Sequence, residues 1–406
     1  MINRRKMFSV VLAFYPLLSM YGLGSISFGD ILLIIALLIG KPPREDRIQW
    51  SRFPVYMLWV YMLWCLIGIT LNMFRADFLL GNMIKRVIKM GLYLIMITAS
   101  TKLLDRHQFV KCYRYLVYLT FAALVVQYVA YYGLGRIIVV KIPFLPYSGV
   151  VTAEGIYTHL VYQFRPGSLY SEPAACCYVL LPFFAYTMFS EKKDKSRRWD
   201  LVVSLISILL TVSSAGIVCC LIILGMYYCN MVMTKRISLQ RKVLILIGSG
   251  ALLVAGIWLY SKTPLYYAME RMQRTEENKI LADVVWGKTN AGSELLGSLN
   301  WWTSWCGMGF GNLSMAKLSD YTNSINYILY CTGYIGMAIL VCWVFSVFVQ
   351  SKRAGKATIL VFGALCIASR IFISSSIMMY AVFCLIDDKQ MDAVETENGV
   401  TASQMQ

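Results

Sequence analysis

Residues 199–230 read WDLVVSLISILLTVSSAGIVCCLIILGMYYCN, an apolar run that is too long for one membrane span and short for two. Basic clusters flank this run at residues 192–198 and 235–242. Short basic loops stay on the cytoplasmic side of a membrane, so the chain has to cross outward and return between them. We therefore predict a hairpin of two short helices that turns near residues 211–216.

The whole chain shares this apolar character. Of its 406 residues, 58% are hydrophobic and 15% are charged, and the mean hydropathy is +0.61. A soluble protein is about 45–50% apolar and about 25% charged. The composition therefore excludes a water-soluble enzyme, a disordered protein and a disulfide-rich secreted module, and it indicates a polytopic membrane protein.

The same reasoning extends to the other apolar runs. They lie near residues 7–23, 28–40, 53–72, 83–104, 112–132, 173–190, 243–260, 325–349 and 357–386. Basic flanks make 7–40 and 357–386 hairpins as well, turning near residues 22–29 and near Arg370. We predict an all-α membrane protein with about 12 transmembrane helices, including these short hairpins, and with both termini in the cytoplasm.

This pattern also sets the expected organisation of the chain. We expect a single membrane domain over residues 1–388 and a polar, disordered cytoplasmic tail at 389–406. Two long loops, 133–172 and 261–324, then face outward, and loops of that length are usually functional. Most of the net charge of +17 belongs to the cytoplasmic loops, so it does not require a nucleic-acid partner.

Metal and disulfide chemistry find little support in the sequence. Most of the 12 cysteines sit inside apolar runs, no Cys-x-x-Cys pair occurs, and His107 and His159 are far apart. Buried cysteine behaves as a small hydrophobic residue. We expect no zinc site and no disulfide framework.

Three cations at the start of one span are not explained by orientation. Lys85, Arg86 and Lys89 open the run 83–104, on the side that the topology makes external. Lys85 and Lys89 are four residues apart and share a helix face. They form either a site for an anion or a ring of side chains that reach up to the interface.

A second unexplained segment, FRPGSLYSEP at residues 164–173, ends the first outer loop. Pro173 suits the first turn of a helix, which places Glu172 at the N-cap, where the helix dipole favours a carboxylate. Arg165 lies seven residues earlier, on a chain turned by Pro166 and Gly167, and is expected to face Glu172. The alternative is a cap with a surface salt bridge, worth about 1 kcal/mol.

Further candidates lie at membrane depth and in the second outer loop. Arg370 sits in a very apolar hairpin, and an ionisable residue there indicates a functional site by default. The rings of Trp301, Trp302 and Trp305 suit a membrane interface, and they also suit stacking on sugars.

The motif Arg165-Pro166-x-Ser168-x-x-x-Glu172-Pro173 resembles the Arg…Glu-Pro signature of bacterial polysaccharide polymerases of the Wzy type, which are related to the O-antigen ligases. Residues 307–312 (GMGFGN) are similar to the Gly-x-Gly-Phe-Gly-Asn element of that family, and 211–216 (TVSSAG) to its short hairpin. Residues 323–336 resemble the span that follows. One departure is Ser214, which stands where the family often carries Arg. Arg370 or the cluster of Lys85, Arg86 and Lys89 could supply the missing charge.

The resemblance implies a GT-C-like fold and a specific reaction. Such enzymes join oligosaccharide repeat units carried on undecaprenyl pyrophosphate at the outer face of the cytoplasmic membrane. On this basis Arg165 is assigned to the pyrophosphate, with Arg86, Lys89, Lys85 and Arg370 as further partners. Glu172 is assigned as general base, or as a residue that orients the sugar or Arg165. The glycan is assigned to residues of the second outer loop: Arg271, Arg274, Trp301, Trp302 and Trp305. Neither a cofactor nor a metal ion is required, and a flippase and a chain-length regulator of the same pathway are possible partners.

Three other functions remain open at this point. A polysaccharide ligase has the same fold, but O-antigen ligases usually carry a functional His in the large outer loop, and residues 261–324 contain none. A flippase or another transporter should show repeat symmetry and polar residues at mid-membrane. A non-catalytic membrane scaffold is the third alternative.

Overall fold

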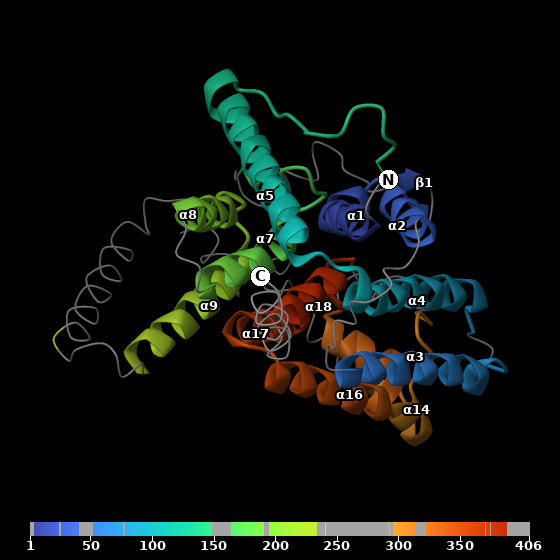
Figure 1. Ribbon diagram of the computed structural model, residues 1–406. Coiled ribbons are helices and arrows are strands. Elements are labelled where there is room, and N and C mark those ends of the chain that lie inside the picture. Colours follow the sequence, from blue (N-terminus) through green and yellow to red (C-terminus); the bar gives the residue numbers. More distant parts are fainter. Residues whose placement is uncertain are drawn as a thin grey trace, which may run out of the picture. The chain divides into compact units, whose positions relative to one another are not determined.

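The computed structural model of the protein describes residues 4–23, 26–39, 52–75, 78–147, 164–190, 195–233, 240, 292, 295–312, 322–369, 371–373 and 375–387. Nearly all of this part of the chain is helical (Figure 1). Four helices in it are long and apolar enough to cross a membrane: Phe53–Asn72, Arg106–Gly133, Ser214–Met233 and Ser324–Gln350. Shorter apolar helices accompany them. This is the pattern of an all-α membrane protein, as the sequence predicts.

The helices are, in chain order, α1 (Arg4–Leu18), α2 (Phe28–Leu38), α3 (Arg52–Asn72), α4 (Leu80–Leu103), α5 (Arg106–Tyr128), α7 (Pro173–Phe189), α8 (Lys195–Leu210), α9 (Ser214–Met233), α14 (Trp301–Cys306), α16 (Ser324–Gln350), α17 (Arg353–Ala368) and α18 (Ser376–Ile386). A π-helical turn, η1 (Val129–Gly133), continues α5, and a 3-10 turn, η3 (Ile371–Ile373), precedes α18. The strands β1 (Gly22–Leu23) and β2 (Ile26–Ser27) form a short antiparallel pair between α1 and α2.

The chain divides into two compact units. Unit 1 comprises Met1–Leu116, Ile142–Gly149 and Val284–Gln406, and unit 2 comprises Val117–Lys141 and Val150–Asp283. The expected single membrane domain over 1–388 stays a prediction.

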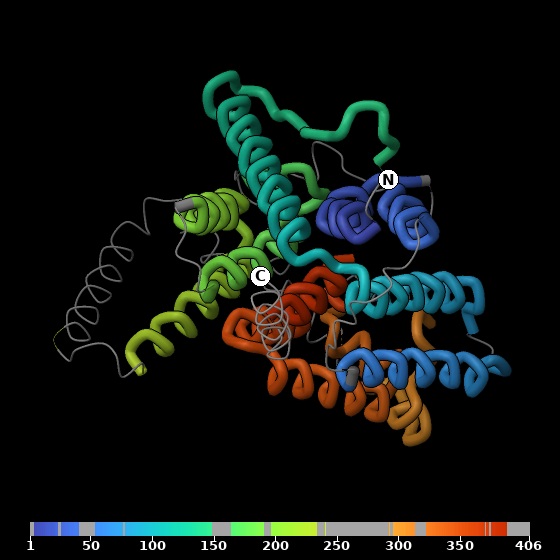
Figure 2. The backbone as a smooth tube through the Cα atoms, in the orientation of Figure 1, coloured from blue at the N-terminus to red at the C-terminus, as the bar shows by residue number. Residues whose placement is uncertain are grey.

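The three hairpins expected from the sequence break where predicted. The chain turns between α1 and α2 at the β1–β2 pair, and three residues separate the end of α8 from the start of α9. Helices α17 and α18 pack together, and the Lys352 N–H donates to the Asp387 carbonyl at 2.8 Å, so the start of α17 meets the end of α18. Figure 2 shows this return of the chain in orange and red.

Unit 1 is built on a layer in which α3 packs against α4 and α16 (Figure 1). The indole of Trp64 in α3 donates to the Thr332 carbonyl of α16 at 2.8 Å. That carbonyl lies beside Gly333, whose φ of 67° breaks the regular helix. The aromatic core is continued by Tyr61, Phe310 and Phe372, which make edge-to-face contacts.

One end of unit 1 collects basic residues, and we call it the basic end. The Asp105 N–H donates to Ser9 Oγ at 2.7 Å, which joins the end of α4 to the start of α1. Burial raises the pKa of the Asp387 carboxyl, against the lowering effects of the Gly355 N–H, Lys352 and Arg106 around it. Lys352 and Arg106, which flank the apolar runs 357–386 and 83–104, therefore lie at the same end of unit 1.

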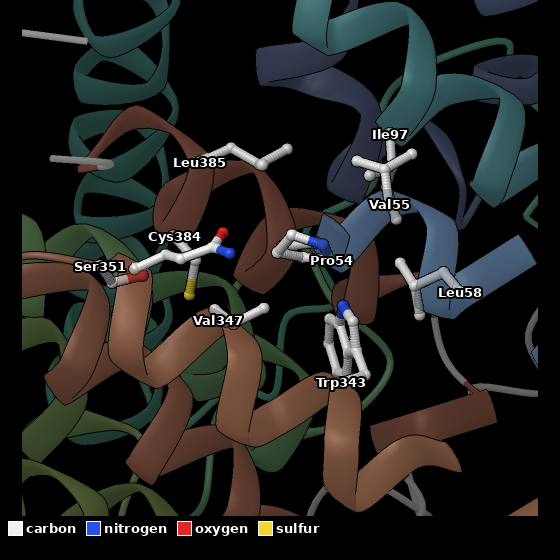
Figure 3. A pocket seen from close by; sticks show the side chains of 11 residues that line it. Pro54, Val55, Leu58, Ile97, Trp343, Val347, Ser351, Cys384 and Leu385 are labelled. Atoms are coloured by element: carbon white, nitrogen blue, oxygen red, sulfur yellow. The ribbon is translucent and has the colours of Figure 1, made fainter. Parts of the chain in front are cut away.

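An apolar cavity of about 20 Å³ lies near the basic end (Figure 3). Val55 and Leu58 of α3, Trp343 and Val347 of α16, and Leu385 of α18 line it. Its volume suits about one water molecule. It is too small to bind a sugar or a phosphate headgroup, so it is not the functional site.

Unit 2 contains α7, α8 and α9, with α7 packed on both of the others. A Cβ added at Gly216 of α9 would collide with the side chain of Cys177 in α7, so this contact requires glycine. The hydroxyl of Tyr118 donates to Asp200 of α8 at 2.8 Å, and that of Tyr128 donates to the Leu210 carbonyl at 2.7 Å. These bonds fasten the C-terminal half of α5 to α8.

Candidate functional site

The first candidate region, which we call the Arg165 turn, consists of residues 164–173 in unit 2. The turn closes where the Tyr170 N–H donates to the Gly167 carbonyl at 3.0 Å. A Cβ at Gly167 would meet the Tyr170 carbonyl and the backbone of Glu172, so a side chain does not fit here. The sequence Pro166-Gly167 thus reverses the chain just before α7.

Two sets of contacts hold the Arg165 turn in place. The ring of Phe164 stacks on Tyr131 at 4.2 Å and meets Tyr128 edge-to-face. The buried amide of Gln127 accepts from the Ser168 N–H at 3.0 Å, and Ser168 Oγ donates to the Thr120 carbonyl at 2.8 Å. These buried hydrogen bonds fix the backbone conformation, because breaking them leaves polar groups unsatisfied.

Arg165 itself reaches the turn between α8 and α9. Its Nε–H donates to the Val212 carbonyl at 3.2 Å, across 47 residues of sequence. Val212 has φ of 50° and Ser168 has φ of 58°. This is the left-handed region, which residues other than glycine rarely adopt and β-branched residues such as Val adopt least. Strained backbone of this kind clusters at functional sites. Two segments that the resemblance assigns to one site are therefore in contact, and both are strained.

The N-terminus of α7 is built as the sequence predicts. Pro173 is the first helical residue, and Glu172 is the N-cap with extended backbone angles. The Glu172 side chain is exposed and makes no capping hydrogen bond. The expected ion pair between Arg165 and Glu172 is not among the ion pairs of the described residues, and the carboxylate remains accessible to a ligand.

The second candidate region, which we call the cation turn, comprises Lys85, Arg86 and Lys89 of α4 in unit 1. Lys85 and Arg86 are exposed. Lys89 is half-buried, forms an ion pair with Asp30 of α2, and lies over the Tyr93 ring at 5.8 Å. The cluster therefore has two exposed cations and one cation that is already paired.

The carboxylate of Asp30, which no sequence motif marks, lies beside the cation turn. It is 4% exposed and accepts from the Tyr15 hydroxyl at 2.7 Å and from the Ser27 N–H at 2.9 Å, in addition to Lys89. Ser27 Oγ accepts from the Asp30 N–H in return, which completes a capping box at the start of α2.

The glycine loop, residues 307–312, packs on the first turns of α4. Asn312 Oδ1 accepts from the Leu79 N–H at 3.1 Å, and Asn312 Nδ2 donates to the Met308 carbonyl at 3.0 Å. Gly311 has φ of 90°, and a Cβ there would press on Arg86. The loop N–H groups of Met308 and Gly309 donate to α16 carbonyls. The loop thus positions Arg86, and these two N–H groups are not available to cradle an anion.

The remaining candidates from the sequence have different outcomes. The rings of Trp301, Trp302 and Trp305 lie on α14 and are exposed, with Trp305 edge-to-face to Tyr334 at 5.6 Å. That exposure suits either a membrane interface or a glycan. Arg271, Arg274 and Arg370 lie outside the described residues.

Sequence reasoning missed two residues that hold the candidate regions together. Gln127 is an amide inside the apolar run 112–132, and Asp30 is a carboxylate at the edge of the run 28–40. A polar residue in such a run is itself a functional signal. That signal identifies the residue but not its partner, which lies 41 positions away for Gln127 and 59 positions away for Asp30.

Comparison with known proteins adds no identification. No protein-family model matches the chain, and no curated protein matches it at a significant level. The assignment to the Wzy-type family therefore stays a prediction from the motifs.

Proposed function

We propose that this protein is a polysaccharide polymerase, a glycosyltransferase that joins undecaprenyl-pyrophosphate-linked oligosaccharide repeat units into surface polysaccharide. The observation that carries the proposal is the bond from Arg165 to the Val212 carbonyl. It brings the Arg…Glu-Pro segment to the short hairpin that the resemblance assigns to the same site. It also brings a guanidinium to the hairpin in which Ser214 replaces the usual Arg.

The glycosyl transfer requires a cation and a base. The anomeric carbon of the growing chain breaks its bond to the pyrophosphate oxygen and forms a bond to a hydroxyl oxygen of the incoming unit. The leaving undecaprenyl pyrophosphate takes the electron pair, and a fixed guanidinium at that position stabilises the developing charge. Arg suits this role, because its planar guanidinium can donate two parallel hydrogen bonds to phosphate oxygens. The Val212 carbonyl holds the Arg165 guanidinium in place.

Glu172 is the proposed base. It accepts the proton of the attacking hydroxyl, which balances the reaction, and it returns the proton to solvent. Its exposed side chain, free of a capping bond, is consistent with that role. A general base contributes about 100-fold to 10,000-fold to the rate of such a step.

The finer architecture belongs to the same proposal. We infer about 12 spans, a GT-C-like arrangement, cytoplasmic termini and a site on the outer face of the bacterial cytoplasmic membrane. The gathering of basic residues at one end of unit 1 supports this orientation. Lys85 and Arg86 then face the pyrophosphate of a lipid-linked unit, and the α14 tryptophans stack on the glycan or lie in the interface. The partners would be the lipid-linked oligosaccharide, a flippase and a chain-length regulator.

A test in cells separates this function from its alternatives. In a strain that lacks the protein, a missing polymerase leaves surface-exposed single repeat units. A missing ligase leaves polymer on the carrier lipid, and a missing flippase leaves no surface units. Complementation with wild type should restore long chains, whereas Arg165→Ala should be present in the membrane and yield single units. Long chains in the deletion strain would overturn the proposal.

A further inference from the structure

The ion pair between Lys89 and Asp30 lowers the net positive charge of the cation turn. If the cation turn only attracted anions, a carboxylate beside it would be counterproductive, because it cancels one of the three positive charges. Yet Asp30 is held on three sides, by Tyr15, by the Ser27 N–H and by Lys89. The carboxylate is therefore fixed in place, and the flexible partner in the pair is Lys89.

We propose that Asp30 is a positioning residue that holds the Lys89 ammonium for contact with a pyrophosphate bound at the cation turn. A lysine ammonium sits on a four-carbon stem and loses rotamer freedom when it binds. The ion pair and the Tyr93 ring restrict that freedom before any ligand arrives. A group that is ordered beforehand costs less to use in binding.

Geometry keeps part of the Lys89 ammonium available. The side chain is 29% exposed, whereas that of Asp30 is 5% exposed. An ammonium has three donor hydrogens, and the ion pair does not consume all of them. Lys89 also lies one helical turn from Lys85 and Arg86, so the three cations occupy one stretch of α4.

This inference rests on the proposed function for the identity of the ligand, but its test does not depend on turnover. The full-length protein in lipid nanodiscs is titrated with farnesyl pyrophosphate, with farnesol as the uncharged control. Counting charges predicts that Asp30→Asn binds the pyrophosphate more tightly, because the site gains one positive charge. If Asp30 positions Lys89, Asp30→Asn should instead bind the pyrophosphate about tenfold more weakly. Lys89→Met should lose the same affinity.

Matched variants separate positioning from a structural role. Ser27→Ala removes the side-chain part of the α2 capping box and leaves the ion pair, so it should bind like wild type. Asp30→Glu retains a carboxylate and should recover most of the affinity. The exchange Asp30→Lys with Lys89→Asp restores an ion pair between α2 and α4, and with it thermal stability, but should not restore binding.

Each outcome decides the inference. Equal losses in Asp30→Asn and Lys89→Met, with no further loss in the double variant, support it. Tighter or unchanged binding in Asp30→Asn, an equal loss in Ser27→Ala, or full binding in the exchanged pair would overturn it. Failure of the polymerase proposal shows separately, as long polysaccharide in the deletion strain.

Discussion

The Arg165 turn and the cation turn hold their cations in different ways. Arg165 donates to the neutral carbonyl of Val212, on a backbone strained at two positions. In the cation turn, Lys89 is paired with a carboxylate, and Lys85 and Arg86 are exposed. One region therefore holds its guanidinium on a backbone carbonyl, and the other combines one paired ammonium with two exposed cations.

The carboxylates of the two regions differ in the same way. Glu172 is exposed and makes no capping bond, whereas Asp30 is buried and bonded on three sides. An accessible carboxylate can exchange a proton with a ligand, and a fully bonded one serves to hold its neighbours. In the proposals above, Glu172 therefore acts as a base, whereas Asp30 holds Lys89 in place.

The largest effect is expected from Glu172→Gln. The change removes basicity but keeps the size of a side chain that makes no capping bond, so the fold should survive. We expect turnover to fall about 100-fold to 10,000-fold, with little change in pyrophosphate affinity. Single-turnover kinetics and a binding titration on the same preparation check this. Wild-type turnover would reduce Glu172 to a structural role.

Arg→Lys substitutions compare the two regions directly. Arg165→Lys keeps the charge but loses the planar guanidinium that donates to Val212 and, in the proposed function, to a phosphate, so it should lower turnover about 100-fold. Arg86→Lys, at an exposed position, should stay within about threefold of wild type. The ratio of the two turnover losses is the quantity to measure. Similar losses at both positions would remove the distinction between a fixed and an exposed cation.

Two glycines in α9 test the packing beneath the Arg165 turn. Gly216→Ala forces α9 away from Cys177 and should destabilise the protein by about 1–3 kcal/mol. Gly225→Ala meets nothing within 4 Å and should be neutral or stabilising by up to about 1 kcal/mol. Thermal unfolding in detergent reports both values. The close contact would be refuted by equal melting temperatures in the two variants.

The smallest effect is expected where the glycine loop meets α4. Asn312→Ala removes the acceptor for the Leu79 N–H and the donor to the Met308 carbonyl, at a cost of about 1 kcal/mol. Pyrophosphate affinity should fall about threefold, as the turn that carries Arg86 loosens. Glu172-dependent turnover at saturating substrate should not change. A selective loss of turnover would place the loop in the chemistry.

The sequence predicts those structural features that depend on residues close together in the chain. Pro173 and Glu172 take the first helical and N-cap positions because capping is decided within one turn of helix. The break between α8 and α9 follows from charge flanks around an apolar run of known length.

The partners of the functional residues could not be read in that way. Asp30 and Lys89 are 59 residues apart, and Gln127 and Ser168 are 41 apart. Their pairing depends on which helices pack together, and apolar helices with weak amphipathic character carry little information about their neighbours. Left-handed backbone at Val212 was equally hidden, since a β-branched residue argues against it.

Reconstitution tests the central claim most directly. Purified wild-type protein in proteoliposomes is given the lipid-linked repeat unit, and the products are separated by chain length. The account predicts a ladder of longer glycans with release of one undecaprenyl pyrophosphate for each bond formed, and no ladder with Arg165→Ala. A wild-type preparation that leaves every unit single, or an Arg165→Ala preparation that yields the same ladder, would contradict it.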